Sequence, residues 1–71
     1  MSKTVLKAIR DSKGRFFGLY TKQGESLNAQ LQSETDKTIV VYDRNYNQTR
    51  RFSKTSITGV RSGSKIFGRI S

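Results

Sequence analysis

Residues 27–43, LNAQLQSETDKTIVVYD, have the pattern of two β-strands joined by a turn. In the first half, Leu27, Ala29 and Leu31 alternate with Asn and Gln, as expected for a strand with one apolar and one polar face. The second half contains a run of β-branched and aromatic residues, which favour the interior of a sheet. The Glu-Thr-Asp at 34–36 is typical of a turn. This stretch therefore predicts a pair of strands with a tight connection.

The period of two continues on both sides of this pair. Phe17, Leu19 and Thr21 alternate with Gly, Tyr and Lys, and turn-forming Gly, Asn and Asp separate the runs at regular intervals. The strands that we expect comprise residues 17–22, 27–32, 37–43, 47–53 and 56–61. Five short strands joined by tight turns predict an all-β domain, a small five-stranded SH3-like barrel, because closure removes exposed sheet edges.

The two ends of the chain are less clearly patterned. Residues 4–10 fit a short helix with three aliphatic residues on one face, but they fit equally well a strand followed by a hairpin loop. Residues 62–71 are small and polar, and we expect them to form a flexible tail. The alternative is that Ile66, Phe67 and Ile70 dock on the domain. The chain, residues 1–71, is short enough to be one domain, in which residues 1–13 form an N-terminal segment.

The charge of the chain is strongly unbalanced. Fourteen Lys and Arg face five Asp and Glu, which gives a formal net charge of +9 on 71 residues. Such an excess destabilises a compact domain by self-repulsion, whereas a net charge of about 2–8 suffices for solubility. Phosphates reward clustered Lys and Arg through counterion release. We therefore expect a nucleic acid to be the partner.

The composition argues against an enzyme. The sequence contains neither Cys nor His, which removes disulfides, zinc–thiolate sites, His-based triads and the commonest general base. Glu34 and Asp36 are a pair of oxygen ligands of the kind that Mg²⁺ takes, but in a turn such acids are far more often solvated. We expect no catalytic residue, no cofactor and no metal.

The apolar residues form no long run. The first ten residues are charged, and the longest aliphatic run, Ile39-Val40-Val41, is far too short to span a bilayer. The basic residues are spread along the chain and do not form one amphipathic helix, which argues against binding to a membrane surface. We therefore expect a cytoplasmic protein that does not associate with membranes.

The densest set of candidate contact residues lies at 42–52, YDRNYNQTRRF, where three aromatic residues are interleaved with three arginines. Aromatic rings stack on bases for about 1–3 kcal/mol each, and arginines contact phosphates. We expect Tyr42 and Phe52 to be core residues and Tyr46 to be an exposed contact. By alternation Arg50 shares a face with Phe52, so it lies at the end of the barrel or is turned outward by a bulge. The expected phosphate contacts are Arg44, Arg50 and Arg51; the alternative is that these arginines only guard an edge strand from aggregation.

Two adjacent aromatic residues, Phe16 and Phe17, lie near the start of the first expected strand. In a strand they must lie on opposite faces, so one is a core residue and the other is exposed or covers a partner. Exposed aromatic residues are found on single-strand binding surfaces, but we expect subunit packing to be the role here.

The stretch from Phe17 to Val60 resembles the Sm and Sm-like (LSm) family, including its bacterial Hfq branch. Residues 19–24 match the first strand with its turn glycine, residues 27–31 match the second strand and residues 39–42 match the third. Residues 52–57, FSKTSI, have the spacing of the family's second motif, apolar-Arg-Gly-x-x-apolar. The pattern is most similar to short, divergent Sm-like proteins associated with phage sequences.

The resemblance implies a homo-oligomeric ring in which strand four of one subunit pairs with strand five of the next. Lys37 and Lys54 occupy positions with which the family lines its central pore, and Ser53 stands where the motif has Arg. The family's base-reading residues are replaced, the stacking ring by Lys37 and the Asn by Ile39. The resemblance therefore implies a ring that holds or remodels single-stranded RNA, rather than DNA, with low sequence specificity.

Together, these considerations define one set of expected nucleic-acid-binding residues. They are Lys37, Arg44, Tyr46, Arg50, Arg51, Ser53 and Lys54. Two other functions remain open: a phage structural or host-interaction module that binds an acidic protein, and a monomeric SH3-like protein that binds duplex DNA. The first would bind no oligonucleotide, and the second would prefer duplexes to single strands.

Overall fold

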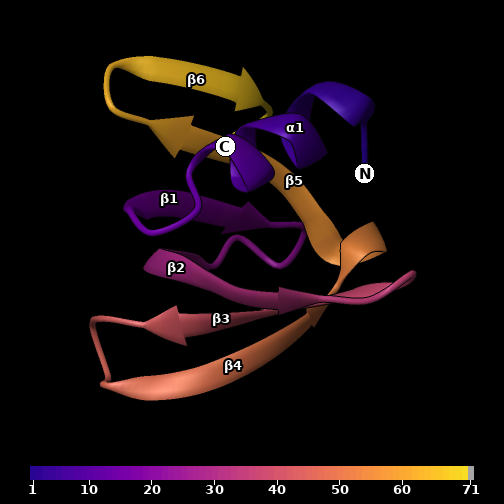
Figure 1. Ribbon diagram of the computed structural model, residues 1–71. Coiled ribbons are helices and arrows are strands. Elements are labelled where there is room, and N and C mark those ends of the chain that lie inside the picture. Colours follow the sequence, from indigo (N-terminus) through magenta and orange to yellow (C-terminus); the bar gives the residue numbers. More distant parts are fainter. Residues whose placement is uncertain (71) are drawn as a thin grey trace.

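The computed structural model describes residues 1–70, which form one helix and a six-stranded antiparallel sheet (Figure 1). In chain order the elements are α1 (Lys3–Asp11), β1 (Phe16–Thr21), β2 (Ser26–Glu34), β3 (Thr38–Asp43), β4 (Gln48–Ser53), the 3-10 helix η1 (Lys54–Ser56), β5 (Ile57–Ser62) and β6 (Lys65–Gly68). The order of strands in the sheet is β4-β3-β2-β1-β5-β6. A small, mostly β domain is therefore confirmed, and its sheet has one strand more than expected.

The N-terminal segment, left open between helix and strand, is the helix α1. The Ser2 hydroxyl caps it by accepting a hydrogen bond from the backbone N–H of Val5 at 3.2 Å. Val5, Ala8 and Ile9 recur at helical spacing and are buried against the sheet. At the other end the Ser12 hydroxyl, itself buried, donates to the carbonyl of Ala8. A cap and an apolar stripe therefore select the helix.

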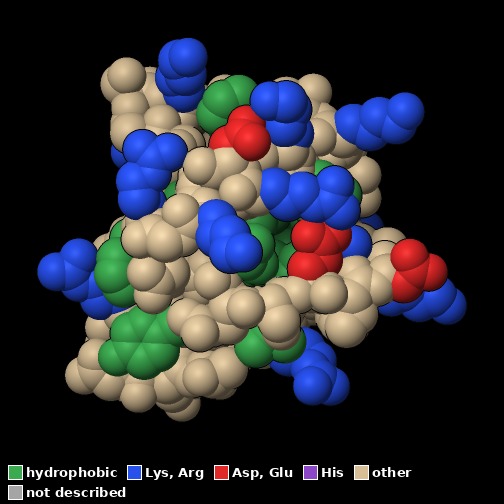
Figure 2. All heavy atoms as spheres, viewed as in Figure 1, with side chains coloured by type: hydrophobic (Ala, Val, Ile, Leu, Met, Phe, Trp, Pro, Cys, Tyr) green, Lys and Arg blue, Asp and Glu red, His purple; other side chains and the backbone are tan. Residues whose placement is uncertain are grey.

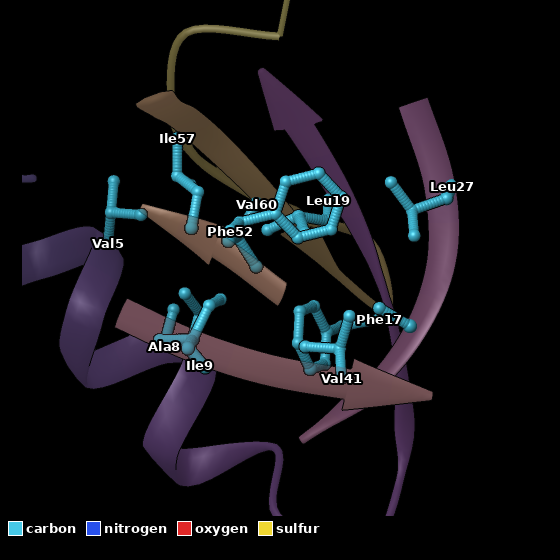
Figure 3. Close-up of a cluster of buried hydrophobic side chains, with 12 residues drawn as sticks. Val5, Ala8, Ile9, Phe17, Leu19, Leu27, Val41, Phe52, Ile57 and Val60 are labelled. Atoms are coloured by element: carbon cyan, nitrogen blue, oxygen red, sulfur yellow. The ribbon is translucent and has the colours of Figure 1, made fainter. Parts of the chain in front are cut away.

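Buried side chains from α1 and from one face of the sheet form a single core, shown in Figure 3. Its members are Val5, Ala8, Ile9, Phe17, Leu19, Leu27, Ala29, Ile39, Val41, Phe52, Ile57 and Val60. The alternation seen in the sequence of β1 and β2 is confirmed, and so is the core position of Phe52. The expectation for Tyr42 was wrong, because this residue lies between the core positions Val41 and Asp43 and is only partly buried, on the opposite face.

The sheet is open and does not close into the expected five-stranded barrel. Among residues 1–70, β4 and β6 stand at its two edges and each pairs on one side only. Register shifts between β1 and β5 at Tyr20/Thr21 and between β2 and β3 at Leu31/Ser33 mark bulges, which bend strands. The result is a curved stack of strands with α1 lying beside β5 and β6 (Figure 1).

Most of the segment that we expected to be a flexible tail is ordered as β6. Lys65–Gly68 pairs with β5, and Phe67 packs against the core. Gly63 has a φ of 62°, which allows the tight turn that returns the chain to β5. The tail prediction was therefore wrong for these residues, while Ser71 lies outside the described part of the chain.

The addition of β6 bears on the ring that the resemblance implies. β5 pairs with β1 on one side and with β6 on the other. A contact between β4 of one subunit and β5 of the next would need an open edge on β5, and β6 occupies that edge.

Candidate nucleic-acid interface

The sheet face that points away from the core carries the side chains between the core positions, and we call it the outer face. Strand pairing brings together residues that are distant in sequence on this face. Phe16 of β1 is opposite Gln30 of β2, which in turn is opposite Tyr42 of β3. In the neighbouring row, Gly18 lies between Asn28 of β2 and Arg61 of β5. The outer face therefore combines aromatic, amide and arginine side chains.

An aromatic pair with an arginine lies at one end of β1. The rings of Phe16 and Tyr42 meet edge to face, with 6.4 Å between their centroids, and 39% of Phe16 is exposed. The Arg44 guanidinium lies over the Phe16 ring, with its central carbon 5.1 Å from the ring centroid. The Tyr42 hydroxyl donates to Asn47 Oδ1 at 2.7 Å, which fixes that ring from its far end. Together these contacts make a surface with an aromatic face and a positive charge.

A groove runs beside this pair across the middle of the outer face. It consists of two shallow hollows that share Gly18, Tyr20 and Asn28. The larger, of about 310 Å³, is bordered by Phe16, Arg44 and Arg61, among others, and the smaller, of about 130 Å³, by Ser26 and Asn45. We call the two hollows together the outer groove.

The glycine at position 18 keeps the floor of the outer groove low. A Cβ built there would lie 3.3 Å from the Tyr20 ring and 3.3 Å from the Cβ of Arg61. The Tyr20 ring therefore lies close to the backbone at Gly18, and any larger residue would push into the ring and the arginine stem.

The turn between β3 and β4 is fixed against β2 by two hydrogen bonds and is held by a third from its own start. The backbone N–H of Arg44 donates to the Asn28 carbonyl at 3.0 Å, and the N–H of Asn28 donates to Asn45 Oδ1 at 3.2 Å. The N–H of Asn45 donates to Oδ1 of Asp43, whose side chain is fully buried. Arg44 and Asn45 are therefore held at the border of the outer groove by backbone contacts, and their side chains need not be ordered by a ligand.

The five carboxylates all lie outside the outer groove. Asp11 pairs with Lys7, Glu34 with Arg10 and Lys54, and Glu25 with Arg50, while Asp43 is buried and Asp36 lies in the loop between β2 and β3. Figure 2 shows the same arrangement on one side of the molecule, where the red carboxylates lie against blue Lys or Arg side chains. The positive charges at the outer groove, Arg44 and Arg61, are therefore not neutralised by an acid that borders it.

Arg50, expected as a phosphate contact, has its guanidinium engaged by carboxylates. Its guanidinium makes a two-pronged ion pair with Glu25, lies 3.7 Å from Asp43 Oδ2 and stacks over the Phe52 ring at 4.8 Å. The hydrogen bond with Glu25 raises the pKa of Arg50 and lowers the pKa of Glu25. Its register with Val41 is regular, so no bulge turns it outward. The charge of Arg50 is therefore engaged on the core side of the sheet.

The structure brings together three other expected residues, Lys37, Ser53 and Lys54. The backbone N–H of Lys54 donates to the Lys37 carbonyl at 2.8 Å, and the Ser53 hydroxyl contacts that of Thr55 at 2.9 Å. The Lys54 ammonium donates to Glu34 at 2.7 Å and its side chain is only 15% exposed. Of the two lysines, Lys37 is thus the one with an exposed side chain.

The two remaining expected residues are exposed. Arg51 lies on the outer side of β4 opposite Val40, and Tyr46 is 75% exposed in the turn after β3. The exposure predicted for Tyr46 is confirmed, while its contact with nucleic acid stays a prediction.

Sequence reasoning missed most of the outer groove. The alternation in β1 that assigns Phe17 and Leu19 to the core also assigns Phe16, Gly18 and Tyr20 to the other face, so this signal was present in the sequence. The position of Arg61 beside Gly18 depends on the pairing of β1 with β5, which carries no local signal.

No family model matches the chain, and no similar protein was found among curated proteins or among solved structures. In residues 1–70, His, Cys, Asp and Glu side chains form no group of three or more that could hold a metal ion. The same part of the chain has no helix that is long and apolar enough to cross a membrane. The geometry of the outer groove is therefore the basis on which function is inferred.

Proposed function

We propose that the protein is a non-enzymatic binder of single-stranded nucleic acid and that the outer groove is its binding surface. The observation that carries this proposal is the convergence of Phe16, Tyr20, Arg44 and Arg61 around Gly18, with all five carboxylates elsewhere. RNA is preferred to DNA because of the resemblance to Sm-like proteins.

Each kind of side chain at the outer groove has a part in this binding. Partly exposed rings such as Phe16 and Tyr20 stack on unpaired bases, whose faces are hidden in a duplex. Arg44 and Arg61 contact phosphates, with Arg44 already held over the Phe16 ring. Stacking and phosphate contacts together favour single strands over duplexes.

A homo-oligomeric ring that acts in RNA processing or remodelling remains part of the proposal. Because β6 covers β5, subunits would join through the two edges that are open in residues 1–70, which belong to β4 and β6. Backbone groups at such edges are satisfied when strands of neighbouring subunits pair.

The direct test is a binding titration with a labelled 12-nucleotide oligo-U RNA at several salt concentrations. Arg61→Ala should weaken binding about fivefold and reduce the slope of log K against log salt by about 0.7, the value for one phosphate contact on a single strand. Tyr20→Ala should weaken binding by a similar factor and leave the slope unchanged, because a stacking contact releases no counterion.

Lys3→Ala is the matched control, because it removes one positive charge from the exposed start of α1. Equal losses for Lys3→Ala and Arg61→Ala would mean that charge alone governs binding and that the outer groove is not the site. Tighter binding of a duplex of the same length would support the duplex-DNA alternative. Failure to bind any oligonucleotide would leave the acidic-protein alternative.

A further inference from the structure

The smaller hollow of the outer groove has a different chemistry from the larger one. Its volume of about 130 Å³ equals that of about four liquid waters, which suits one small planar ring. Its polar side chains are uncharged: Tyr20, Ser26, Asn28 and Asn45 border it. Such a pocket selects its occupant by hydrogen bonding, and the larger hollow attracts phosphates through Arg44 and Arg61.

The amide of Asn45 has a fixed orientation in this pocket. Its Oδ1 accepts the backbone N–H of Asn28 at 3.2 Å, which identifies the oxygen side of the amide. Its own backbone N–H is held at 2.9 Å by the buried Asp43. Among residues 1–70, no hydrogen bond from Asn45 Nδ2 is formed, so this NH₂ group is the end of the amide that remains for a ligand.

We propose that Asn45 reads one base in the smaller hollow and that it favours bases presenting a carbonyl oxygen, such as uracil, over adenine. This inference rests on the proposed function and gives its binding surface a sequence preference. The preference would be set by residues on the outer face, whereas the resemblance to Sm-like proteins implies low sequence specificity.

The preference follows from which half of the Asn45 amide is engaged. Asparagine reads adenine through two bonds, for which the amide oxygen accepts from N6 and the amide nitrogen donates to a ring nitrogen. Here the oxygen is already directed at the backbone of Asn28, so the amide presents chiefly donors. A uracil carbonyl accepts such a donor. The N6 amino group of adenine is itself a donor, so adenine loses one of the two bonds through which asparagine reads it.

The test compares the affinities for 12-nucleotide oligo-U and oligo-A RNA. Wild-type protein should bind oligo-U at least about fivefold more tightly than oligo-A. Asn45→Asp keeps an oxygen for the Asn28 N–H and replaces the NH₂ group by a second oxygen, so the ratio of the two affinities should fall to about one or reverse. The thermal unfolding of each variant shows whether it is folded.

Gln23→Glu is the matched control, because it makes the same amide-to-acid change at an exposed position of the turn after β1. It should lower both affinities by the same factor and keep the ratio. Equal binding of both strands by wild-type protein, or an unchanged ratio in Asn45→Asp, would overturn the proposal while leaving the outer groove as a non-specific site. Binding of neither strand would overturn the proposed function and this inference together.

Discussion

Arg44 and Arg50 belong to one arginine-rich segment, yet their side chains have opposite surroundings. Arg44 lies over the Phe16 ring at the outer groove, and Arg50 is bound by Glu25 on the core side of the sheet. The difference arises because Arg44 is in a turn fixed by Asn28, whereas Arg50 alternates in register with Phe52. A basic residue in such a sequence is a candidate for phosphate binding only when no carboxylate already holds it.

Glu34 is the carboxylate with the most cationic partners. It accepts hydrogen bonds from Arg10 at 2.6 and 3.0 Å and from Lys54 at 2.7 Å. These bonds, that of Arg10 first, lower the pKa of Glu34 from 4.5 to about 2. Because the pKa is lower in the folded state, the stabilisation is complete above the unfolded value and is lost as the pH falls from there towards 2.

We predict that Glu34→Gln lowers the free energy of unfolding at pH 7 by about 1 kcal/mol. This is less than the free energy that corresponds to the shift in the pKa of Glu34, because Arg10 is solvent-exposed and water screens the ion pair. It should also flatten the pH dependence of stability between pH 4.5 and 2. Urea unfolding at a series of pH values measures both effects. Asp36→Asn, in the exposed loop after β2, is the control and should leave the curve near that of wild type. A Glu34→Gln curve parallel to wild type would contradict the assignment.

At the scale of elements, β6 is the main difference between the observed fold and the fold predicted from the sequence. It pairs with β5 through four residue pairs and brings Phe67 onto the core. The close approach depends on glycine, because a Cβ at Gly59 would overlap the backbone of Arg69. At Gly68, a φ of 75° and the neighbouring Val5 side chain also favour a residue without Cβ.

We predict that Gly59→Ala displaces β6 while the rest of the sheet stays folded. Hydrogen exchange of the β6 amides should become at least tenfold faster, because overpacking at such a contact costs about 1–3 kcal/mol. Protection in β3 should be unchanged. Lys65→Ala, on the exposed part of β6, serves as the control. If the exchange of the β6 amides is unchanged in Gly59→Ala, the backbones at Gly59 and Arg69 are not in close contact in solution.

At the scale of the whole molecule, the open sheet edges favour pairing between subunits, whereas the net charge opposes it. A charge of +9 on 71 residues opposes self-association, and both edge strands carry exposed basic residues, Arg51 on β4 and Lys65 on β6. A polyanionic strand would relieve this repulsion. Assembly of the proposed ring should therefore depend on nucleic acid and on salt.

We predict that light scattering across a sizing column shows a closed oligomer of the 8.1 kDa chain when oligo-U is added at low salt, and a smaller mass when the strand is left out. High salt should remove the effect of the strand, because it weakens the phosphate contacts. A mass that remains monomeric under all conditions would contradict the ring. In that case the titrations with Arg61→Ala and Tyr20→Ala would test whether a single chain binds the strand at the outer groove.

The sequence by itself determined the features that depend on neighbours in the chain. Alternation assigned Phe17, Leu19, Leu27 and Ala29 to the core, because side chains of a strand point to opposite faces with a period of two. Turn residues located most strand ends for the same local reason. The polyanionic partner that the charge predicts stays a prediction. For the N-terminal segment, local signals allowed two answers, and packing of Val5 and Ile9 on the sheet selected the helix.

The tertiary structure alone decided which distant residues meet. The pairing of β6 with β5, the outward position of Tyr42 and the bond of Arg50 with Glu25 depend on strand register across the sheet. The outer groove likewise joins residues from β1, β2, β5 and the turn after β3. Such contacts are fixed by the balance between core burial and the hydrogen bonding of whole strands, and no local pattern in one sequence records that balance.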